Sequence, residues 1–381
     1  MAKYILKSAL FPSISHPILI FRRQSQFPGF TPPCPIPYNR PFIDQYTDPP
    51  MSTTNVDLDT IESTTSQALK AHGADDWIAD SVAHAVRVAE GYGNRICGLY
   101  YLESYCAQLK TGRVLGNVEP EVSQPKPGSV KVDAKLGFAQ PAFTRGLPTA
   151  LEAAKVNGIA SLAICHAHTC TSLGYFTEQI ARAGFIAIGL TNASACVSPP
   201  GGTKAVLGTN PFSMSVPAED GGLAMHFDQS TSAIALGKIT MAAAAGEDIP
   251  VGWGVDSEGQ STTDPNAVIK GGSLMSSGGY KGYGFGLMVE ILAAAFTNGN
   301  TSTQLEPLKK PEGTPHDLGQ TYIIIDPTNV AGQGFWQRME AIQEVIKAQP
   351  GARLPGANKT QQPVVELDDK VWQQAINLSQ A

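Results

Sequence analysis

The chain of 381 residues lacks several features that would classify a protein at once. No apolar run reaches the roughly 18 residues of a transmembrane helix, so we expect no membrane partner. Only 16% of the residues are charged and the net charge is −6, which gives no electrostatic case for nucleic acid or an anionic membrane. Neither a GxGxxG nor a GxxxxGK[ST] pattern occurs, so no Rossmann fingerprint and no P-loop can be assigned.

Regular cysteine spacing is also missing. The six cysteines are scattered through a chain that is too large to need disulfide staples, so we expect free thiols in a reducing compartment. One segment, Cys165-His166-Ala167-His168-Thr169-Cys170, holds four soft metal ligands within six residues. Structural zinc sites usually combine two separated pairs, and alternate side chains of a strand point to opposite faces. We therefore predict no metal site.

Glycine-rich blocks are what the chain does have. They are Gly201–Pro211 and Gly278–Gly284, with a Ser- and Thr-rich block, Phe227–Ser232, between them; together they carry Thr, Asn and Ser with one Asp and two Lys. Glycine lets backbone N–H groups approach a phosphate, lysine neutralises its charge, and aspartate can accept a ribose hydroxyl. The blocks therefore predict a phosphorylated ligand.

These blocks, in this order, resemble the malate/L-lactate dehydrogenase-like oxidoreductases, which are unrelated to the Rossmann-type enzymes. The resemblance runs from about Leu58 to the C-terminus. It includes Val130–Asp133 leading into Gly137–Pro141, and Thr262–Pro265. It implies an NAD- or NADP-dependent enzyme that acts on a small carboxylate and forms a homodimer.

The expected fold follows from the same resemblance. Alternating strands and helices between Ser129 and Thr191 would by themselves suggest a parallel doubly wound sheet. The family implies instead a mixed α/β fold with a largely antiparallel, non-Rossmann NAD(P)-binding sheet and a second domain. We expect an N-terminal helical part (51–123), an NAD(P)-binding domain (124–290) and a C-terminal segment (291–381) that returns to the N-terminal part.

Hydrophobic periodicity and glycine or proline breaks predict the individual elements. The expected helices are Asp57–Gly73, Asp75–Glu90, Gly98–Leu109, Pro141–Asn157, Leu173–Ala183, Ser232–Ala245, a buried Leu287–Phe296, an amphipathic Gly334–Ala348, and Asp368–Ser379. The expected strands are Ser129–Val132, Ile159–Cys165, Phe185–Thr191, Leu223–Phe227 within a strand-like stretch 203–228, and Tyr322–Ile325.

Residues 1–50 differ from the rest because five basic residues precede the first acidic one, Asp44, and proline is dense. This composition is typical of an organellar transit peptide. The alternative is that translation starts at Met51. Either way we expect an unstructured leader, with the protein cytoplasmic or, if the leader is genuine, organellar.

The usual catalytic motif of the family is replaced in this chain. The family carries Ser-His-Gly after the second helix, an Arg three residues beyond that Gly and a Tyr four residues further on. The His is thought to protonate the carbonyl oxygen and the Arg to hold the substrate carboxylate. Alignment places Ile96-Cys97-Gly98 and Tyr101 at these positions and keeps Tyr105.

Three interpretations of this replacement stay open. The site can be rebuilt, with Arg95 holding the carboxylate and His168, Tyr101 or Cys97 donating the proton. The substrate can be a cyclic imino acid, whose protonated iminium needs no donor, although the reductases of such substrates carry an acidic residue where this chain has Lys238. Finally, the chain can be a cofactor-binding pseudoenzyme.

The other family positions transfer directly by resemblance. Thr209 matches a substrate contact, and Tyr105 is retained beside the substrate. Asp228 is the expected ribose partner. The remaining residues expected to bind the cofactor are Asn192, Gln229, Ser230, Lys281, Gly282 and Arg338. We predict hydride transfer to or from C2 of a small 2-oxo or 2-hydroxy acid, with imino acid reduction as the alternative. The resemblance does not distinguish NAD from NADP.

Overall fold

A seven-stranded sheet forms the centre of the protein in a computed structural model that describes residues 52–381. Its strand order is β2-β3-β4-β11-β5-β6-β7, and every neighbouring pair is antiparallel except β3 and β4. The expected mixed, largely antiparallel fold is therefore confirmed. The parallel pairing that the alternation of strands and helices would suggest occurs only between β3 and β4. The strands are β2 (Glu121–Lys126), β3 (Ser129–Asp133), β4 (Ile159–Ala167), β5 (Ile186–Thr191), β6 (Phe212–Pro217), β7 (Leu223–Gln229) and β11 (Leu318–Ile325).

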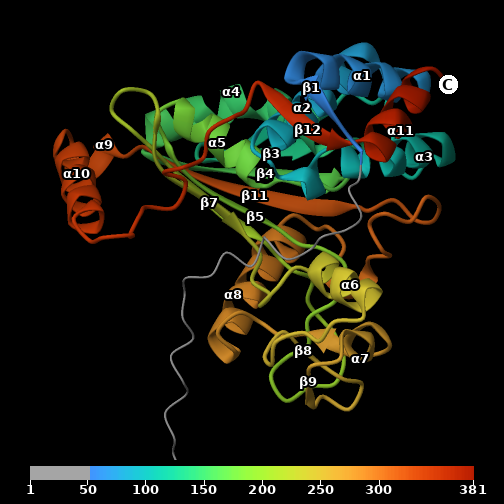
Figure 1. Cartoon of the computed structure of the whole chain (residues 1–381). Helices are drawn as coiled ribbons and strands as arrows, with labels where there is room; N and C mark the ends of the chain where they lie inside the picture. Colours follow the sequence, from blue (N-terminus) through green and yellow to red (C-terminus); the bar gives the residue numbers. More distant parts are fainter. Residues whose placement is uncertain (1–51) are drawn as a thin grey trace, which may run out of the picture. The chain divides into compact units, whose positions relative to one another are not determined.

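Two helices cover one face of this sheet (Figure 1). Helix α4 (Ala139–Asn157) joins β3 to β4 and ends at Gly158, which has a positive φ of 78°. Helix α5 (Gly174–Arg182) joins β4 to β5. Phe143 of α4 and Phe176 of α5 pack edge-to-face at 4.9 Å over Tyr322 of β11, and burial of each such ring contributes about 2–3 kcal/mol. This packing joins α4 and α5 to the central strand β11.

A second helical layer combines both ends of the described chain. Helices α1 (Leu58–Ala71), α2 (Asp76–Gly91) and α3 (Leu102–Thr111) share a core with the C-terminal α11 (Asp369–Ser379). Asp57 caps α1 by accepting a hydrogen bond from the Thr60 amide at 2.8 Å. The sequence did not reveal β1 (Thr53–Asp57) and β12 (Val364–Asp368), which pair antiparallel beside these helices.

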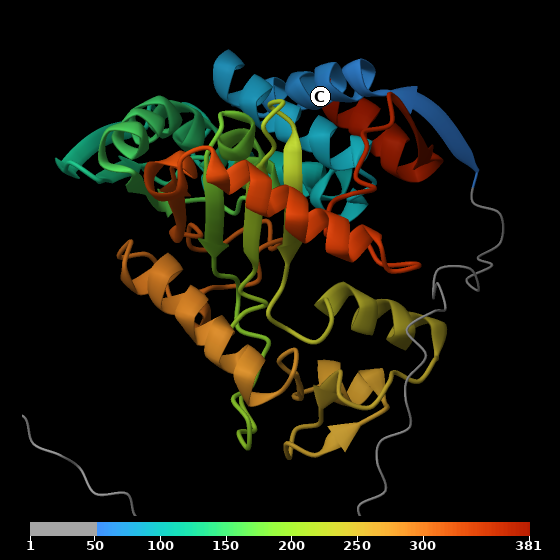
Figure 2. The same ribbon diagram turned by 90° about the vertical axis from the view of Figure 1, so that its left-hand side faces the viewer.

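The opposite face of the sheet carries α8 (Tyr280–Glu290), which continues as a π-helical turn, η3 (Ile291–Ala295). The expectation of a buried helix at 287–296 is wrong. Val289 and Ala293 pack against Leu190 of the sheet, whereas Ile291 and Phe296 are 52% and 57% exposed. The helix is amphipathic because only one of its sides meets the sheet, and Figure 2 shows it as the long orange helix at the lower left.

The remaining elements lie in loops and short helices. The stretch expected to be strand-like from Thr203 is a loop up to Pro211, and the helix expected from Ser232 begins at Leu236. A three-stranded sheet of order β10-β8-β9 packs with α7. These elements are α6 (Leu236–Ala245), β8 (Gly254–Val255), β9 (Ser261–Thr262), α7 (Pro265–Ile269), β10 (Ser273–Leu274) and the single turn η4 (Ser302–Gln304).

The segment 291–381 divides between the two layers. Its strand β11 lies between β4 and β5 at the centre of the sheet, whereas β12 and α11 return to the N-terminal helices. Between them, α9 (Thr328–Ala331) and α10 (Gly334–Lys347) form an arm in which no residue is buried. Residues 1–50, the expected leader, lie outside the described residues. Within 52–381 no helix combines the length and apolarity needed to cross a bilayer.

Candidate active site

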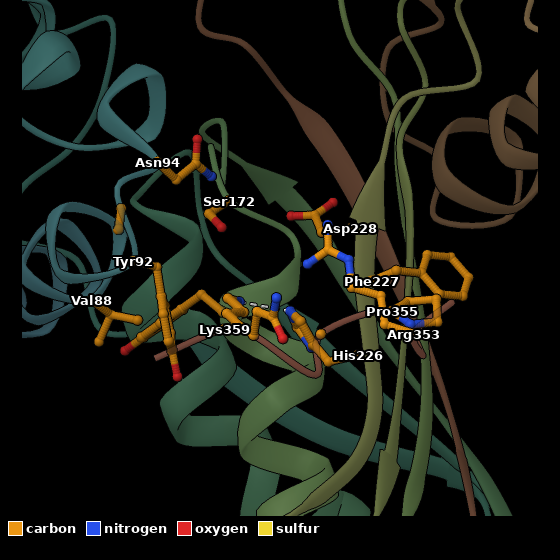
Figure 3. Close-up of a pocket in the computed structure, with 14 residues that line it drawn as sticks. Val88, Tyr92, Asn94, Ser172, His226, Phe227, Asp228, Arg353, Pro355 and Lys359 are labelled. Atoms are coloured by element: carbon orange, nitrogen blue, oxygen red, sulfur yellow. Dashed lines mark hydrogen bonds between the residues drawn. The ribbon is translucent and has the colours of Figure 1, made fainter. Parts of the chain in front are cut away.

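A cavity of about 390 Å³ opens beside the end of β7 (Figure 3). One wall is the C-terminal end of α2 with Tyr92 and Asn94, and another is the loop before α5 with Ser172. The third wall is a segment that follows α10 and includes Arg353 and Lys359. Three distant parts of the chain therefore meet at one polar hollow.

Asp228 is held at this cavity by the start of α5. Its Oδ2 accepts a hydrogen bond from the Gly174 amide at 2.7 Å, and the Leu173 amide and Ser172 hydroxyl also donate to it. The carboxylate reaches solvent inside the cavity, but surrounding protein desolvates it and raises its pKa. Asp228 therefore presents acceptor oxygens from a fixed position.

The next two residues of the expected turn, Gln229 and Ser230, continue from Asp228. Gln229 is exposed, and Ser230 is half-buried with its Oγ accepting a hydrogen bond from Ser232 at 3.0 Å.

Lys359 supplies positive charge to the cavity wall. Its Nζ donates to His226 Nε2 at 2.7 Å, lies 4.1 Å from the centre of the Tyr92 ring and is 3.6 Å from Glu178. Burial lowers the pKa of Lys359, and burial together with the lysine charge lowers the pKa of His226 to about 4. Arg353 also faces the cavity, as Figure 3 shows, and makes no ion pair with any residue of the described chain.

These groups fit a dinucleotide. Asp228 can accept ribose hydroxyls, and Arg353 and Lys359 can bind phosphate oxygens. A second cavity of about 530 Å³ shares Val88, Tyr92, Tyr175 and Lys359 with the first, so a long ligand has room to extend. A bound nicotinamide cofactor would supply hydride there.

Cys97 and Tyr101 lie on two single 3-10 turns after α2, η1 (Arg95–Cys97) and η2 (Leu99–Tyr101). Burial raises the pKa of both side chains to about 12, and the Asp228 charge adds to the rise at Cys97. Tyr101 packs against Tyr105 at 5.8 Å, and burial also raises the pKa of Tyr105. The structure thus brings Cys97, Tyr101 and Tyr105 together near Asp228, as weakly acidic groups.

Arg95 is placed differently from what its expected role requires. It is exposed, and its Nη2 donates to the backbone oxygen of Glu366 on β12 at 2.9 Å. It does not line the cavity. A guanidinium tied to β12 gives no support to the expected role of Arg95 as the carboxylate clamp.

His168 is equally unsuited to the proton donation expected of it. It is 2% exposed, stacks on His316 at 4.0 Å, and places Nε2 2.7 Å from Gln108 Oε1. Tyr105 and Phe138 enclose it at 5.6 and 5.3 Å. Burial lowers its pKa well below the usual range, so the imidazole is neutral at physiological pH.

The neighbouring thiols and imidazoles do not converge on a metal. His166 pairs with Asp317 at 2.7 Å while His168 turns to Gln108. No group of three or more potential ligands comes together within residues 52–381. All five cysteines in that range are free.

The other expected cofactor and substrate residues lie around α8. Thr209 accepts two hydrogen bonds from Thr231 through its backbone oxygen, at 2.9 and 3.1 Å. Gly282 is in the first turn of α8, where a Cβ would overlap the carbonyl oxygen of Ser277. Lys281 beside it is exposed, so its ammonium is available to a ligand.

Asn192 and Arg338 complete the expected set. Asn192 is buried and donates to the backbone oxygen of Asn300 at 2.9 Å, while its Oδ1 has no partner among the described residues. Arg338 is exposed on α10, away from the residues that line the cavity.

Of the residues that line the cavity, sequence reasoning named only Asp228 as a site residue, and the basic or imidazole side chains that it missed are His226, Arg353 and Lys359. The available signal was the basic pair that flanks Pro355-Gly356 in the loop after the amphipathic helix. Their convergence with Asp228 depends on a contact between the end of the chain and β7, where the His226 amide donates to the backbone oxygen of Pro355 at 3.1 Å.

Comparison with known proteins identifies the family. The sequence profile of malate/L-lactate dehydrogenase matches residues 56–374. The chain belongs to the malate/L-lactate dehydrogenase family. It is therefore an oxidoreductase, and an NAD or NADP cofactor agrees with the cavity described above.

Several relatives in this family resemble the chain over most of its length. The Δ1-pyrroline-2-carboxylate/Δ1-piperideine-2-carboxylate reductase of Pseudomonas putida is 35% identical over 311 residues, which cover 82% of this chain and 91% of the relative. The (2R)-3-sulfolactate dehydrogenase (NADP+) of Chromohalobacter salexigens is 35% identical and covers 80% and 90%. The crystal structure of Δ1-piperideine-2-carboxylate reductase from Pseudomonas syringae aligns with a TM-score of 0.78 at 32% identity, covering 86% and 100%.

Proposed function

We propose that this chain is an NAD(P)H-dependent reductase of a small carboxylate with a double bond at C2, and that a cyclic imino acid is its best substrate. One observation carries this choice. His168, one of the three expected proton donors, is sequestered, and burial raises the pKa values of the other two, Cys97 and Tyr101, to about 12, so that they are weaker acids than usual. Relatives that reduce Δ1-pyrroline- and Δ1-piperideine-2-carboxylate support the same choice.

The chemistry of an imine explains why a proton donor is dispensable. A protonated cyclic imine already carries the proton on nitrogen, so hydride arrival at C2 forms the C–H bond and converts the C=N bond to a neutral amine. Reduction of a 2-oxo acid instead creates an alkoxide, which must receive a proton. In the proposed site Asp228, Arg353 and Lys359 hold the ribose and phosphates of the cofactor, and Lys281 and Gly282 contact it from α8.

A 2-oxo acid is the second candidate substrate. The sulfolactate dehydrogenase relative acts on a hydroxy acid by its name, and the family resemblance places Lys238 where imino acid reductases carry an acidic residue. Tyr101 or Cys97 would then donate the proton. A cofactor-binding pseudoenzyme is the alternative of a different class.

Turnover against two substrate panels tests the proposal. NADH and NADPH oxidation by the protein starting at Met51 is measured with cyclic imino acids and with 2-oxo acids between about pH 6 and 9. Turnover of imino acids alone supports the proposal, whereas efficient turnover of oxo acids alone contradicts it. Tight cofactor binding without turnover on either panel would favour the pseudoenzyme.

We also propose that the chain forms a homodimer through the outer face of α8 and η3. Phe285, Met288, Ile291 and Phe296 on this face are 54%, 40%, 52% and 57% exposed. A contiguous apolar helix face of this kind marks a protein interface, and a second copy of the chain is the occupant that the family resemblance implies. Light scattering of Ile291→Glu tests it, since an unchanged mass at every concentration contradicts this interface. A cytoplasmic or organellar location stays a prediction.

A further inference from the structure

Cys97 and Tyr101 lie on a sharp corner of the backbone. The turns η1 and η2 are three residues each and meet at Gly98, and neither has a side-chain cap. Turns this short do not hold their shape by their own hydrogen bonds, because forming a single turn is unfavourable. The positions of both side chains therefore depend on the contacts that this corner, residues 95–101, makes with the rest of the protein.

Glu90 supports this corner. It belongs to the last turn of α2, is 3% exposed, and its Oε1 accepts a hydrogen bond from the Leu99 amide at 2.7 Å. A Cβ on residue 98 would lie 2.6 Å from Cδ of Glu90 and overlap the carboxylate oxygen. The carboxylate thus fills the space under Gly98 and binds the first amide after it.

The support has an energetic cost. A buried carboxyl group in its charged form is unfavourable, and burial raises the pKa of Glu90 although the Leu99 amide and the nearby Arg95 oppose the rise. A neutral side chain of similar size would fill the same space without that cost. What the corner requires is the shape of this side chain and its acceptor oxygen for the Leu99 amide, rather than its charge.

We propose that Glu90 is a positioning residue of the active site, whose carboxylate sets the corner that carries Cys97 and Tyr101 near Asp228. The effect on turnover rests on the proposed function, whereas the effect on the corner does not. Glu90 itself does not line the cavity, and Asp228 and Lys281 belong to β7 and α8, so we expect cofactor affinity to stay close to that of the wild type.

Three purified variants test the turnover part. Glu90→Gln retains the shape and an acceptor oxygen for Leu99, so its turnover remains close to that of the wild type. Glu90→Ala removes both, and we expect a loss on the order of 100-fold in kcat/KM, carried mainly by kcat, with unchanged NAD(P)H affinity. Glu152→Gln, on the exposed side of α4, is the surface control. Equal activity of Glu90→Ala and the control would overturn the proposal.

Gly98→Ala provides an independent test through a double-mutant cycle. The added methyl group collides with the Glu90 carboxylate in the wild type but occupies the vacated space in Glu90→Ala. The loss caused by Gly98→Ala is therefore much smaller in the Glu90→Ala background. Strictly additive losses would show that the two residues do not act through this contact. If Glu90→Ala does not fold, Gly98→Ala alone must lower kcat while leaving cofactor affinity unchanged.

Alkylation of Cys97 separates this inference from the proposed activity. Cys97 is half-buried, so iodoacetamide should label it slowly, and a displaced corner in Glu90→Ala should raise the rate several-fold by peptide mass spectrometry. Faster labelling in a protein that turns over neither substrate panel would refute the proposed function and retain the role of Glu90. Unchanged labelling would refute that role whatever the activity.

Discussion

Acid should destabilise this protein through His226, and the size of the effect follows from its contacts. Lys359 can only donate, so the Nε2 that lies 2.7 Å from it carries no proton, and the Nδ1 proton points to Ser215 Oγ at 2.8 Å. Protonation of Nε2 would remove the lysine hydrogen bond and place two positive charges side by side in a site where the imidazole is 4% exposed.

The sign and magnitude can be worked out by linkage. Burial lowers the pKa of His226 from 6.5 to about 4, so between these values the unfolded chain binds a proton that the native state does not. The contribution of neutral His226 to stability is therefore fully present above pH 6.5 and is lost as the pH falls towards 4. Near pH 5.3 the unfolded chain binds about 0.9 proton more than the native state, so the free energy of unfolding changes by about 1.2 kcal/mol per pH unit. Over the whole range the loss of stability is about 3 kcal/mol.

Urea unfolding at closely spaced pH values between 7 and 4.5 measures this slope. His226→Gln keeps an acceptor for Lys359 but cannot titrate, so its slope should be smaller than that of the wild type by about 1.2 kcal/mol per pH unit. His84→Gln, which removes a half-exposed imidazole, serves as the matched control. Identical slopes for His226→Gln and the wild type would refute the reasoning, whatever their absolute stabilities.

Three further outcomes are expected. Lys281→Ala should weaken NAD(P)H binding in a fluorescence titration, and an unchanged Kd would remove Lys281 from the site. His168→Phe should leave Gln108 Oε1 unpaired and cost about 1–3 kcal/mol in unfolding free energy while turnover persists; abolished oxo acid reduction in a folded variant would restore His168 as the donor. Gly282→Ala should lower the Tm by the equivalent of more than about 2 kcal/mol, because its Cβ overlaps the Ser277 carbonyl, and a Tm equal to that of the wild type would exclude this packing.

Local physics was sufficient to predict most elements from the sequence. Helix α4 ends where Gly158 adopts a positive φ, β11 ends before Asp326-Pro327, and α1 begins after its cap Asp57. Each of these signals acts within a few residues of itself, and so it can be recognised without the fold. The antiparallel sheet was predicted from the family resemblance of several separated sequence blocks. The alternation of strands and helices alone would have predicted a parallel sheet.

The failures have a common cause in contacts between distant residues. Apolar content predicted that Leu287–Phe296 is buried, but the sheet meets only one side of that helix. Strand β1 is polar and short, and it exists because β12, about 300 residues later, pairs with it. Local sequence contains no information about which side of a helix or which edge of a strand will find a partner.

The sequence by itself determined the family, the glycine turns and the loss of the usual catalytic pair at Ile96-Cys97. The tertiary structure decided which remaining groups are available for chemistry. It enclosed His168 among aromatic rings, tied Arg95 to β12, and brought Lys359 to Asp228 from the other end of the chain. Availability depends on burial and on hydrogen-bond partners, and both arise only when segments that are far apart in the sequence pack together.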